Sequence, residues 1–324
     1  MIRLGVDAFN LELDRRGMGR YARAMLAGLR EYSEFEITLI DRDTLRNLRG
    51  HSFDVLWYPW NGVRFAARAP KVVTIHDPFA FTQPHRSAVA RWREQRPIRH
   101  GARIAQAITT VSKWSAQTIG EILRIDAAAI EVIPPVLDPF WQPVQSARAM
   151  RPYFLFVAGP EPRKNATMLF AAFKHAFPQG EAMLAIVGTL SAADATQLNT
   201  AGIVHERLSP DDEALRELYS SAVAVAVPSL AEGYGLMAIE GMACGAPVLA
   251  ADAAALPETC DGAALLIAPD DPQAWSTGLR RVWDDRVFGL ALRDRSLERV
   301  TRFDSKRSVS AMAALLQRVA RDTR

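Results

Sequence analysis

The chain alternates short apolar runs with longer amphipathic stretches from its first residues onward. In the first half, the apolar runs are rich in β-branched residues and read "IRLGV", "FEITLI", "DVLWY", "KVVTI", "AQAITTV" and "IEVI". Runs of this length and composition are typical of buried strands, and the stretches between them are long enough for crossover helices. The alternation therefore predicts βαβ units on a parallel sheet.

A second series of the same kind follows an irregular segment. Five prolines interrupt any regular pattern between Pro134 and Pro152, and "YFLFVAG", "AMLAIVG", "GIVHE", "AVAVAVP" and "PVLAA" come after them. A length of 324 residues also favours two domains. We therefore expect two Rossmann-like domains, over residues 1–145 and 146–303, and a final amphipathic helix within residues 304–324.

Composition argues against several classes of protein. Asp7 lies too early for the apolar part of a signal peptide, and no uncharged apolar run approaches the roughly 18 residues of a membrane-spanning helix, so we expect a cytoplasmic protein. Cys244 and Cys260 have neither CxxC spacing nor a histidine cluster, which leaves them as small core residues. The "DRD" of Asp41 to Asp43 has the spacing of metal-binding carboxylates, but its position favours an ordinary strand end, and we expect no metal site.

Positive charge is concentrated in one segment of the first half. Residues 1–150 hold 21 Lys and Arg against 15 Asp and Glu, whereas residues 151–324 hold 18 against 21. Within residues 85–107, Glu94 is the single acid, and apolar residues separate six arginines: Arg86, Arg91, Arg93, Arg96, Arg99 and Arg103. A solvated helix kinked at Pro97 would explain this pattern. The near absence of acids instead favours an anionic membrane surface as a partner, and not nucleic acid.

Four loops that follow predicted strands carry unusual residues. In open parallel sheets, ligands bind beyond the carboxyl ends of the strands, where loops lead into helices. The four loops are "RRGMGRY" (residues 15–21), "TIHDPF" (74–79), "AGPEPRKN" (158–165) and "EGYGLMAIEGMACGAPV" (232–248). We therefore expect the functional site among these loops.

The last of these loops places two carboxylates around a predicted helix. Gly233 and Gly235 permit tight turns, and the helix that starts near Gly235 would point free N–H groups at an anion. Beyond phosphates at that position, Glu232 is suited to sugar hydroxyls. Glu240 lies within an apolar helical run, where an unpaired carboxylate is costly, and a ribose diol would supply its donors. The alternatives are a structural ion pair for Glu240 and a solvated loop position for Glu232.

The remaining loops offer cations, glycines and an imidazole. Arg163 and Lys164 precede a helical run and could neutralise a diphosphate, although a solvated charge pair is the simpler alternative. Gly17 and Gly19 would let the backbone approach a phosphate or sugar, but a GxG sequence alone is a weak signal. His76 could donate to a sugar or relay a proton, although single histidines are more often structural.

Taken together, these motifs resemble the retaining glycosyltransferases of family four, over nearly the whole chain. The most specific part is Glu232-x7-Glu240 within "PSLAEGYGLMAIEGMACGAPVLAAD", followed by "LPE" at residues 256–258. Support comes from "EPRKN", "AITTVSKWS", "IEVIPPVLDPF" and "GMGRYARAMLAGL". The resemblance implies an α/β protein of GT-B architecture, in which two Rossmann-like domains with parallel sheets face each other across a cleft and the final helix packs back on the N-terminal domain.

The resemblance also implies roles for the motif residues. Glu240 would bind the nucleotide ribose, Glu232 the transferred sugar, and Arg163 with Lys164 the donor diphosphate. His76 would lie near the transferred sugar. The other donor contacts would come mainly from backbone, with Gly235, Leu236 and Met237 cradling phosphate, Gly17 and Gly19 facing the cleft, and Arg207 and Leu208 holding the nucleobase. No cofactor and no metal are implied.

The expected reaction moves a hexose from a nucleotide diphosphate sugar to a hydroxyl of a glycan or lipid-linked glycan, with retention. Similarity to bacterial mannosyltransferases of envelope polysaccharides favours GDP-mannose as donor. Another sugar, such as glucose, N-acetylglucosamine or rhamnose, or a small-molecule acceptor remains open, as does a non-catalytic module that binds a nucleotide sugar or lipid. An epimerase or phosphorylase fits less well. The chain has "IPPV" at residues 133–136 where relatives often have "IPNG", and its shortness indicates trimmed acceptor loops.

Overall fold

The computed structural model describes residues 1–14, 17–65, 67–85, 87–145, 151–303 and 305–322. The chain forms two compact units. Unit 1 comprises residues 1–138 with 304–324, and unit 2 comprises residues 139–303. Residues 146 and 304, at which two of the expected domains begin, lie outside the described residues.

Unit 1 is built on a sheet of six strands in which every pairing is parallel. The strand order is β2-β1-β3-β4-β5-β6. The strands coincide with the predicted apolar runs: β1 (Ile2–Asp7), β2 (Phe35–Ile40), β3 (Val55–Tyr58), β4 (Lys71–Thr74), β5 (Ala107–Thr110) and β6 (Ile130–Val132). Because their side chains are apolar on both faces, the central strands are buried between helices.

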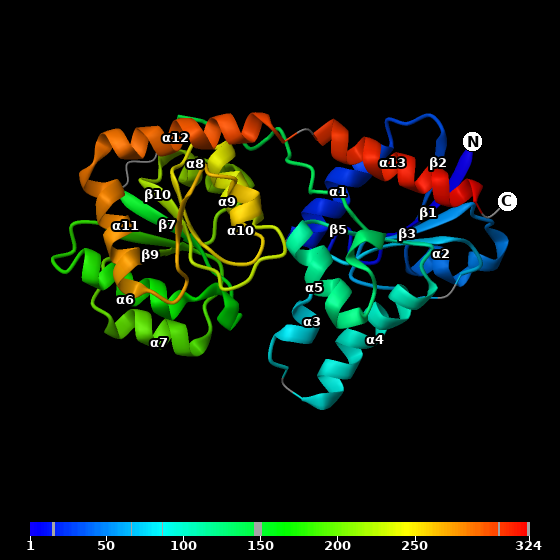
Figure 1. The fold of residues 1–324 in the computed structure, drawn as a ribbon, viewed down its shortest axis with the longest axis horizontal. Helices are drawn as coiled ribbons and strands as arrows, with labels where there is room; N and C mark the ends of the chain where they lie inside the picture. Colours follow the sequence, from blue (N-terminus) through cyan, green and yellow to red (C-terminus); the bar gives the residue numbers. More distant parts are fainter. Residues whose placement is uncertain (15–16, 66, 86, 146–150, 304, 323–324) are drawn as a thin grey trace. The chain divides into compact units, whose positions relative to one another are not determined.

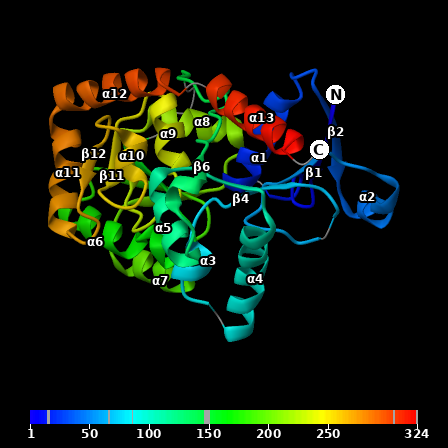
Figure 2. The ribbon, with the colours of Figure 1, turned by 45° about the vertical axis from the view of Figure 1, so that its right-hand side comes forward.

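The helices of unit 1 include one from the far end of the chain. They are α1 (Gly17–Leu29), α2 (Arg42–Arg46), α3 (Phe79–Thr82), α4 (Ala88–Ile104), α5 (Lys113–Leu123) and α13 (Ser305–Arg321), with short 3₁₀ turns η1 (Leu48–Gly50) and η2 (Ala127–Ala129). Figures 1 and 2 show α13, in red, lying against α1. A Cβ atom on Gly28 of α1 would lie 2.4 Å from Cγ2 of Val309, so glycine permits this close packing.

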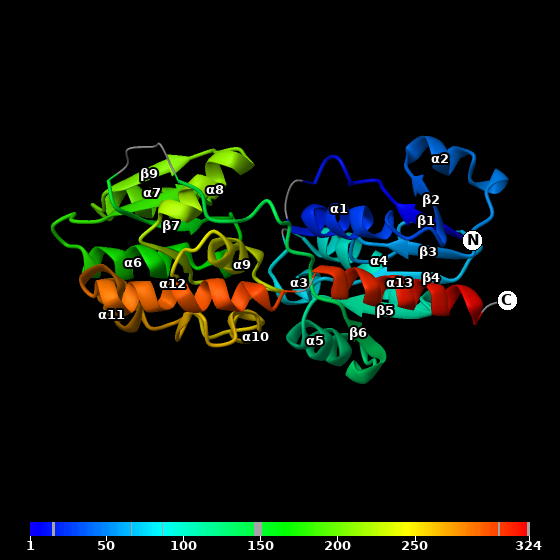
Figure 3. The ribbon, with the colours of Figure 1, turned by 90° about the horizontal axis from the view of Figure 1, so that it is seen from above.

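Unit 2 repeats the architecture with a second parallel sheet of six strands, in the order β12-β11-β10-β7-β8-β9. Its strands are β7 (Tyr153–Val157), β8 (Met183–Val187), β9 (His205–Leu208), β10 (Ala224–Val227), β11 (Val248–Ala251) and β12 (Leu265–Ile267). The helices are α6 (Ala166–Ala176), α7 (Ala192–Thr200), α8 (Asp212–Ser221), α9 (Leu236–Ala243), α10 (Leu256–Cys260), α11 (Pro272–Asp284) and α12 (Arg286–Thr301), and η3 (Pro162–Lys164) is a 3₁₀ turn. In Figure 3, α11 and α12, in orange, follow one another along this unit.

Each strand order contains a point at which the chain changes direction across the sheet. In unit 2, β7 and β10 are neighbours, and the chain continues from β7 toward β8 but from β10 toward β11. In unit 1, the equivalent neighbours are β1 and β3. Loops that leave such strands diverge and open a crevice at their carboxyl ends, where α/β proteins bind ligands. The predicted α/β class with two parallel sheets is therefore confirmed, and each sheet has one preferred place for a site.

The two cysteines and the "DRD" segment have structural positions in this fold. Cys244 and Cys260 are free and buried, as predicted. Asp41 follows β2 and caps α2 by accepting the N–H groups of Asp43 and Thr44, while Asp43 pairs with Arg46 at 3.1 Å. Among the described residues, no helix is both long enough and apolar enough to cross a membrane.

Candidate functional site

The start of α9 is set by a glycine that no other residue could replace without strain. Gly235 has φ +98°, and a Cβ atom there would lie 2.7 Å from Cδ2 of Leu256. Its carbonyl accepts the N–H groups of Ala238 and Ile239, so the N–H groups of Leu236 and Met237 precede the first hydrogen bonds of the helix. The prediction of a helix starting near Gly235 is confirmed, and its first turn presents amide donors.

Glu232, just before this turn, is buried against two cations. Nζ of Lys164 lies 2.7 Å from Oε1 of Glu232, and Nη1 of Arg163 lies 3.1 Å from Oε2. The side chains of Arg163 and Lys164 are 15% and 9% exposed. The alternatives of a solvated Glu232 and a solvated charge pair are therefore wrong, because the fold packs all three groups into one cluster.

The electrostatics of this cluster keep Glu232 charged. Burial disfavours the carboxylate, but the charges of Lys164 and Arg163, together with hydrogen bonds from Lys164 and Ser229, hold the pKa of Glu232 below its usual value. Arg163 also donates from Nη1 to the carbonyl of Ala231 at 3.1 Å. The cations and the carboxylate are thus fixed relative to one another before any ligand binds.

Asn165 explains how the loop after β7 reaches the loop after β10. Its backbone is left-handed (φ +58°), and its side-chain amide donates to the carbonyls of Pro228 at 3.1 Å and Pro269 at 2.7 Å. The N–H of Leu230 donates to the carbonyl of Arg163 at 2.7 Å. These bonds tie together the carboxyl ends of three strands, so the charged cluster lies at the point where the strand order of unit 2 reverses.

Glu240 lies within α9 and is only 3% exposed. The hydroxyl of Tyr219, from α8, donates to its Oε2 at 3.3 Å. Burial, and secondly the charge of Glu240, raise the pKa of the Cys244 thiol to about 12, so the thiol stays protonated. The structure therefore gives Glu240 a phenolic partner that sequence reasoning missed. No local pattern pointed to Tyr219, because it lies 21 positions away.

Arg207 and Leu208 close the edge strand β9 of unit 2. They pair with Ile186 and Val187 of β8 in parallel register, and Arg207 is exposed. Since β9 is the last strand of the sheet, its outer backbone groups face away from β8. Binding of the nucleobase by this backbone, the role that the resemblance implies, stays a prediction.

His76 belongs to unit 1 and follows β4. Its Nε2 donates to the carbonyl of Pro59 at 2.8 Å, and its backbone N–H donates to the side chain of Asn61 at 2.6 Å. The ring of Tyr21 meets the imidazole edge-on, with centroids 4.8 Å apart. Burial lowers the pKa of His76 to about 4, so the ring is neutral near neutral pH.

Gly17 and Gly19 lie in the first turn of α1. A Cβ atom on Gly19 would lie 1.7 Å from the carbonyl oxygen of Asp14, so the chain's own close approach explains that glycine. Arg15 and Arg16, the start of the same predicted loop, lie outside the described residues.

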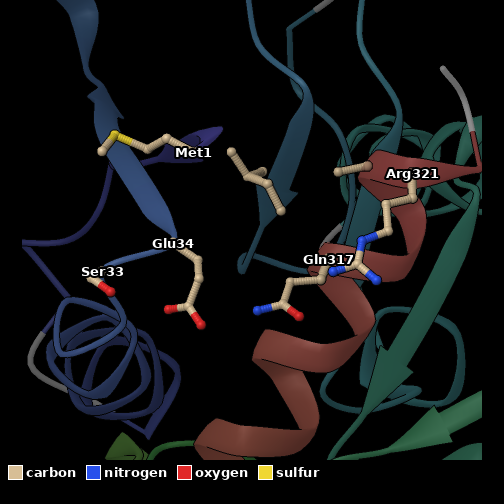
Figure 4. Close-up of a pocket in the computed structure, with 7 residues that line it drawn as sticks. Met1, Ser33, Glu34, Gln317 and Arg321 are labelled. Atoms are coloured by element: carbon tan, nitrogen blue, oxygen red, sulfur yellow. The ribbon is translucent and has the colours of Figure 1, made fainter.

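A cavity of about 450 Å³ lies at the amino-terminal end of β1 in unit 1, the end opposite to the loops that carry the predicted site residues. Figure 4 shows the side chains of Glu34 and Gln317 extending toward one another across it. Its lining residues are Met1, Ile2, Ser33, Glu34, Gln317, Ala320 and Arg321. None of the predicted site residues lines this cavity.

Comparison with known proteins places both units among glycosyltransferases. Residues 151–285 match the family model described as "Glycosyl transferases group 1", and residues 32–139 match the model described as "Glycosyltransferase Family 4". The chain is 29% identical over 261 residues to an MMP α-(1→4)-mannosyltransferase of Mycolicibacterium hassiacum, covering 75% of this chain and 63% of that protein. It is 28% identical to O-antigen chain mannosyltransferase B of Escherichia coli, covering 72% of this chain and 66% of that protein. The chain thus spans less than two thirds of the length of these relatives.

Solved structures agree on the fold. A sucrose-phosphate synthase from Thermosynechococcus elongatus superposes with a TM-score of 0.78 at 19% identity, covering 98% of this chain and 99% of that one. Anabaena HepE in complex with UDP and glucose has a TM-score of 0.77 at 16% identity, covering 98% and 100%. WaaG, a glycosyltransferase involved in lipopolysaccharide biosynthesis, has a TM-score of 0.73 at 13% identity, with 98% and 99% covered. At these identities the likeness concerns the GT-B fold alone.

Proposed function

The two units of this chain are glycosyltransferase domains of the group 1 and family 4 type, and we propose that the chain transfers a hexose from a nucleotide diphosphate sugar to a hydroxyl of a glycan or lipid-linked glycan, with retention. The observation that carries the proposal is the buried cluster of Glu232, Lys164 and Arg163 beside the first turn of α9. The two cations and the amides of the first helical turn are groups that bind phosphate, once Glu232 gives up its contacts with the cations.

The same groups account for the chemistry. Departure of a nucleoside diphosphate puts negative charge on phosphate oxygens, which Lys164, Arg163 and the amides of α9 stabilise in a water-poor site. Retention then follows from attack on the side that the leaving group vacates, with the departing phosphate oxygen taking the acceptor's proton. Glu232 is held by the same two cations, so a bound diphosphate competes with Glu232 for Lys164 and Arg163. The carboxylate of Glu232 then becomes an acceptor for sugar hydroxyls.

GDP-mannose is the proposed donor, and polysaccharide biosynthesis the proposed setting. The relatives named above from Mycolicibacterium and Escherichia are mannosyltransferases, and the second acts on O-antigen chains. Transfer of glucose, N-acetylglucosamine or rhamnose, transfer to a small molecule, and simple binding without catalysis are the competing possibilities.

The test is a panel of GDP, UDP and ADP and their sugars, read first by thermal shift and then by release of the nucleotide. GDP and GDP-mannose should raise the melting temperature most, and GDP-mannose should be hydrolysed slowly without acceptor. Lys164→Met is the matched control, because it removes a cation of the anion site and should abolish the shift. Preference for UDP would overturn the donor. Binding without any hydrolysis or transfer would favour a non-catalytic module.

We also propose that an anionic membrane surface brings the acceptor to the enzyme, through α4. Figure 2 shows the N-terminal turns of this helix, in cyan, extending beyond the rest of unit 1. Val89 and Trp92 are 64% and 58% exposed, and the five described arginines of the helix are exposed around them. Glu94, the one acid, lies 3.2 Å from Nε2 of His85. Arg86, predicted as part of the same face, lies outside the described residues.

A further inference from the structure

The place where the strand order of unit 1 reverses holds a buried carboxyl with no role in the function described so far. Asp7 ends β1 beside β3 and is 1% exposed. Its Oδ1 accepts the N–H of Phe9 at 3.2 Å, whereas its Oδ2 has no hydrogen-bond partner within the described part of the chain. An acceptor oxygen buried in this way costs free energy that the fold does not recover.

At the amino-terminal ends of β1 and β3, a second carboxylate, Asp54, has a structural role. Asp54, which precedes β3, accepts the backbone N–H of Arg3 at 2.9 Å and pairs with its guanidinium at 3.1 Å. Stability of the β1–β3 pair therefore accounts for Asp54 but not for Asp7. The two residues differ in that Asp7 lies at the carboxyl ends of the strands, where ligands bind in sheets of this kind.

The surroundings of Asp7 suit a sugar. Among the described residues, the charge of Arg64 acts on Asp7, and burial together with the charge of Asp7 raises the pKa of the Tyr58 phenol. The rings of Phe9 and Phe65, on the loops that leave β1 and β3, pack with centroids 5.8 Å apart, and both side chains are only partly buried. A carboxylate beside an aromatic surface matches a ligand that has hydroxyls on its edge and an apolar ring face.

We propose that Asp7 binds the acceptor by accepting a hydrogen bond from one of its sugar hydroxyls at Oδ2, with Phe9 and Phe65 against the sugar ring. The inference rests on the proposed function and extends it to unit 1. The indole of Trp60 donates to the carbonyl of Asp7 at 2.7 Å and holds the end of the strand in place.

Ionisation of Asp7 predicts how the stability of the fold depends on pH. Burial raises the pKa of Asp7 to about 6, while the Phe9 N–H and Arg64 oppose the rise. A carboxyl whose folded-state pKa is raised destabilises the fold increasingly as pH rises from its unfolded-state pKa through about 6. Asp7→Asn, uncharged and of the same shape, should therefore raise the melting temperature at pH 8, and much less at pH 4.

The experiment compares the full chain with Asp7→Asn and with the matched control Asp54→Asn. The probes are GDP-mannose and methyl α-D-mannopyranoside as a soluble acceptor. Asp7→Asn should hydrolyse GDP-mannose within about twofold of the wild type, yet lose roughly 10- to 100-fold in kcat/KM for the acceptor, the value of a hydrogen bond to a charged group. The wild-type kcat/KM should fall below about pH 6, and this dependence should vanish in Asp7→Asn. Asp54→Asn should melt lower and keep both activities.

Binding of methyl α-D-mannopyranoside alone, followed by NMR, separates this proposal from the proposed function. If the wild type neither hydrolyses nor transfers, the proposed function fails, but the binding comparison still decides on Asp7. Weaker binding by Asp7→Asn than by the wild type and Asp54→Asn supports the site. Equal binding by Asp7→Asn, no binding by the wild type, or a lower melting temperature for Asp7→Asn at pH 8 overturns it.

Discussion

Glu232 and Glu240 are eight positions apart in the sequence, but they have different neighbours. The carboxylate of Glu232 is held by Lys164 and Arg163, whereas that of Glu240 accepts from the neutral hydroxyl of Tyr219. A diphosphate that binds Lys164 and Arg163 must displace Glu232 from these cations, whereas Glu240 does not contact them and need not move. Removing each negative charge should therefore have opposite effects on nucleotide affinity.

We expect Glu232→Gln to bind free GDP as tightly as the wild type or more tightly, because the cations lose their competing carboxylate, while its transfer rate falls. Glu240→Gln should bind GDP roughly 10-fold more weakly, as expected for loss of a charged hydrogen-bond acceptor for the ribose. Isothermal titration calorimetry measures the GDP affinity of both variants. Tyr219→Phe is the control, since it removes the hydroxyl that donates to Glu240 and leaves the carboxylate in place. Equal losses for the two glutamate variants would contradict this division.

Arg163 and Lys164 can be tested by substitution as well. Lys164→Met should lower the transfer rate by roughly 10²- to 10³-fold, because a donor to the leaving group is lost. It should also destabilise unit 2 by up to about 3 kcal/mol, since Glu232 stays buried with one cation instead of two.

The double variant Lys164→Met/Glu232→Gln separates the two effects of that substitution. It should recover most of the melting temperature, because no carboxylate is left partly paired, but none of the activity. Recovery of activity together with stability would mean that Lys164 acts only through the fold.

Sequence reasoning found the residues of this cluster but not their arrangement. Glu232, Arg163 and Lys164 were recognisable because they stand next to predicted strand ends. The contacts between them span 68 and 69 positions (232 − 164 and 232 − 163) and depend on Asn165, which joins three loops. Tyr219 and Asp7 were missed for the same reason, since each owes its significance to neighbours that only the folded sheet supplies.

At the scale of elements, the pattern of apolar runs predicted which segments form strands but not their order in the sheet. The order matters, because the reversal between β7 and β10 determines where the cations and Glu232 meet. The sequence pattern also predicted the ends of strands less well than their existence. Strand β9 begins at His205, three residues after the start of the predicted run "GIVHE". Hydrogen bonds to β8 decide that boundary, and they lie outside the sequence of the strand itself.

The surface of α4 is the element whose role can be tested most directly. Only Ile98 and Gly101 of this helix are buried, and the carbonyl of Pro97 accepts the N–H of Val63 at 3.1 Å. The helix is thus anchored through its C-terminal half, and the turns that carry Arg91, Trp92 and Arg93 contribute nothing to the core. Substitutions there should change binding to a surface without changing the fold.

We expect the full chain to sediment with phosphatidylglycerol vesicles but not with phosphatidylcholine vesicles, and added salt should release it. The triple variant Arg91→Gln/Arg93→Gln/Arg96→Gln should bind roughly two orders of magnitude more weakly, at about 1 kcal/mol per cation. The matched control removes the same charge from exposed positions of unit 2, as Arg286→Gln/Arg295→Gln/Arg302→Gln. Similar losses in both triple variants would indicate a general charge effect, and no preference for anionic lipid would refute the membrane proposal.

For the whole molecule, two parallel sheets of six strands and the glycosyltransferase family were both predictable from the sequence. The reason is that buried parallel strands need continuous apolar runs, and the motifs that follow them occupy short, contiguous loops. GDP-mannose as donor stays a prediction, because the base contacts proposed near Arg207 and Leu208 come from backbone, which carries little side-chain information. The acceptor also stays a prediction, since the proposed contact with Asp7 depends on neighbours that only the folded sheet of unit 1 supplies.

The proposed reaction must balance the charge of its leaving group. A nucleoside diphosphate leaving group needs positive charge, which proteins supply either by a divalent metal or by their own groups. In the proposed reaction this charge comes from Lys164, Arg163 and the first turn of α9, while Asp41 caps a helix and Asp43 pairs with Arg46. Transfer from GDP-mannose should therefore proceed at the same rate in excess EDTA as in Mg²⁺, and Lys164→Met should not be rescued by Mg²⁺. If EDTA abolishes transfer and Mg²⁺ restores it, the leaving-group role proposed for Lys164 and Arg163 is incomplete.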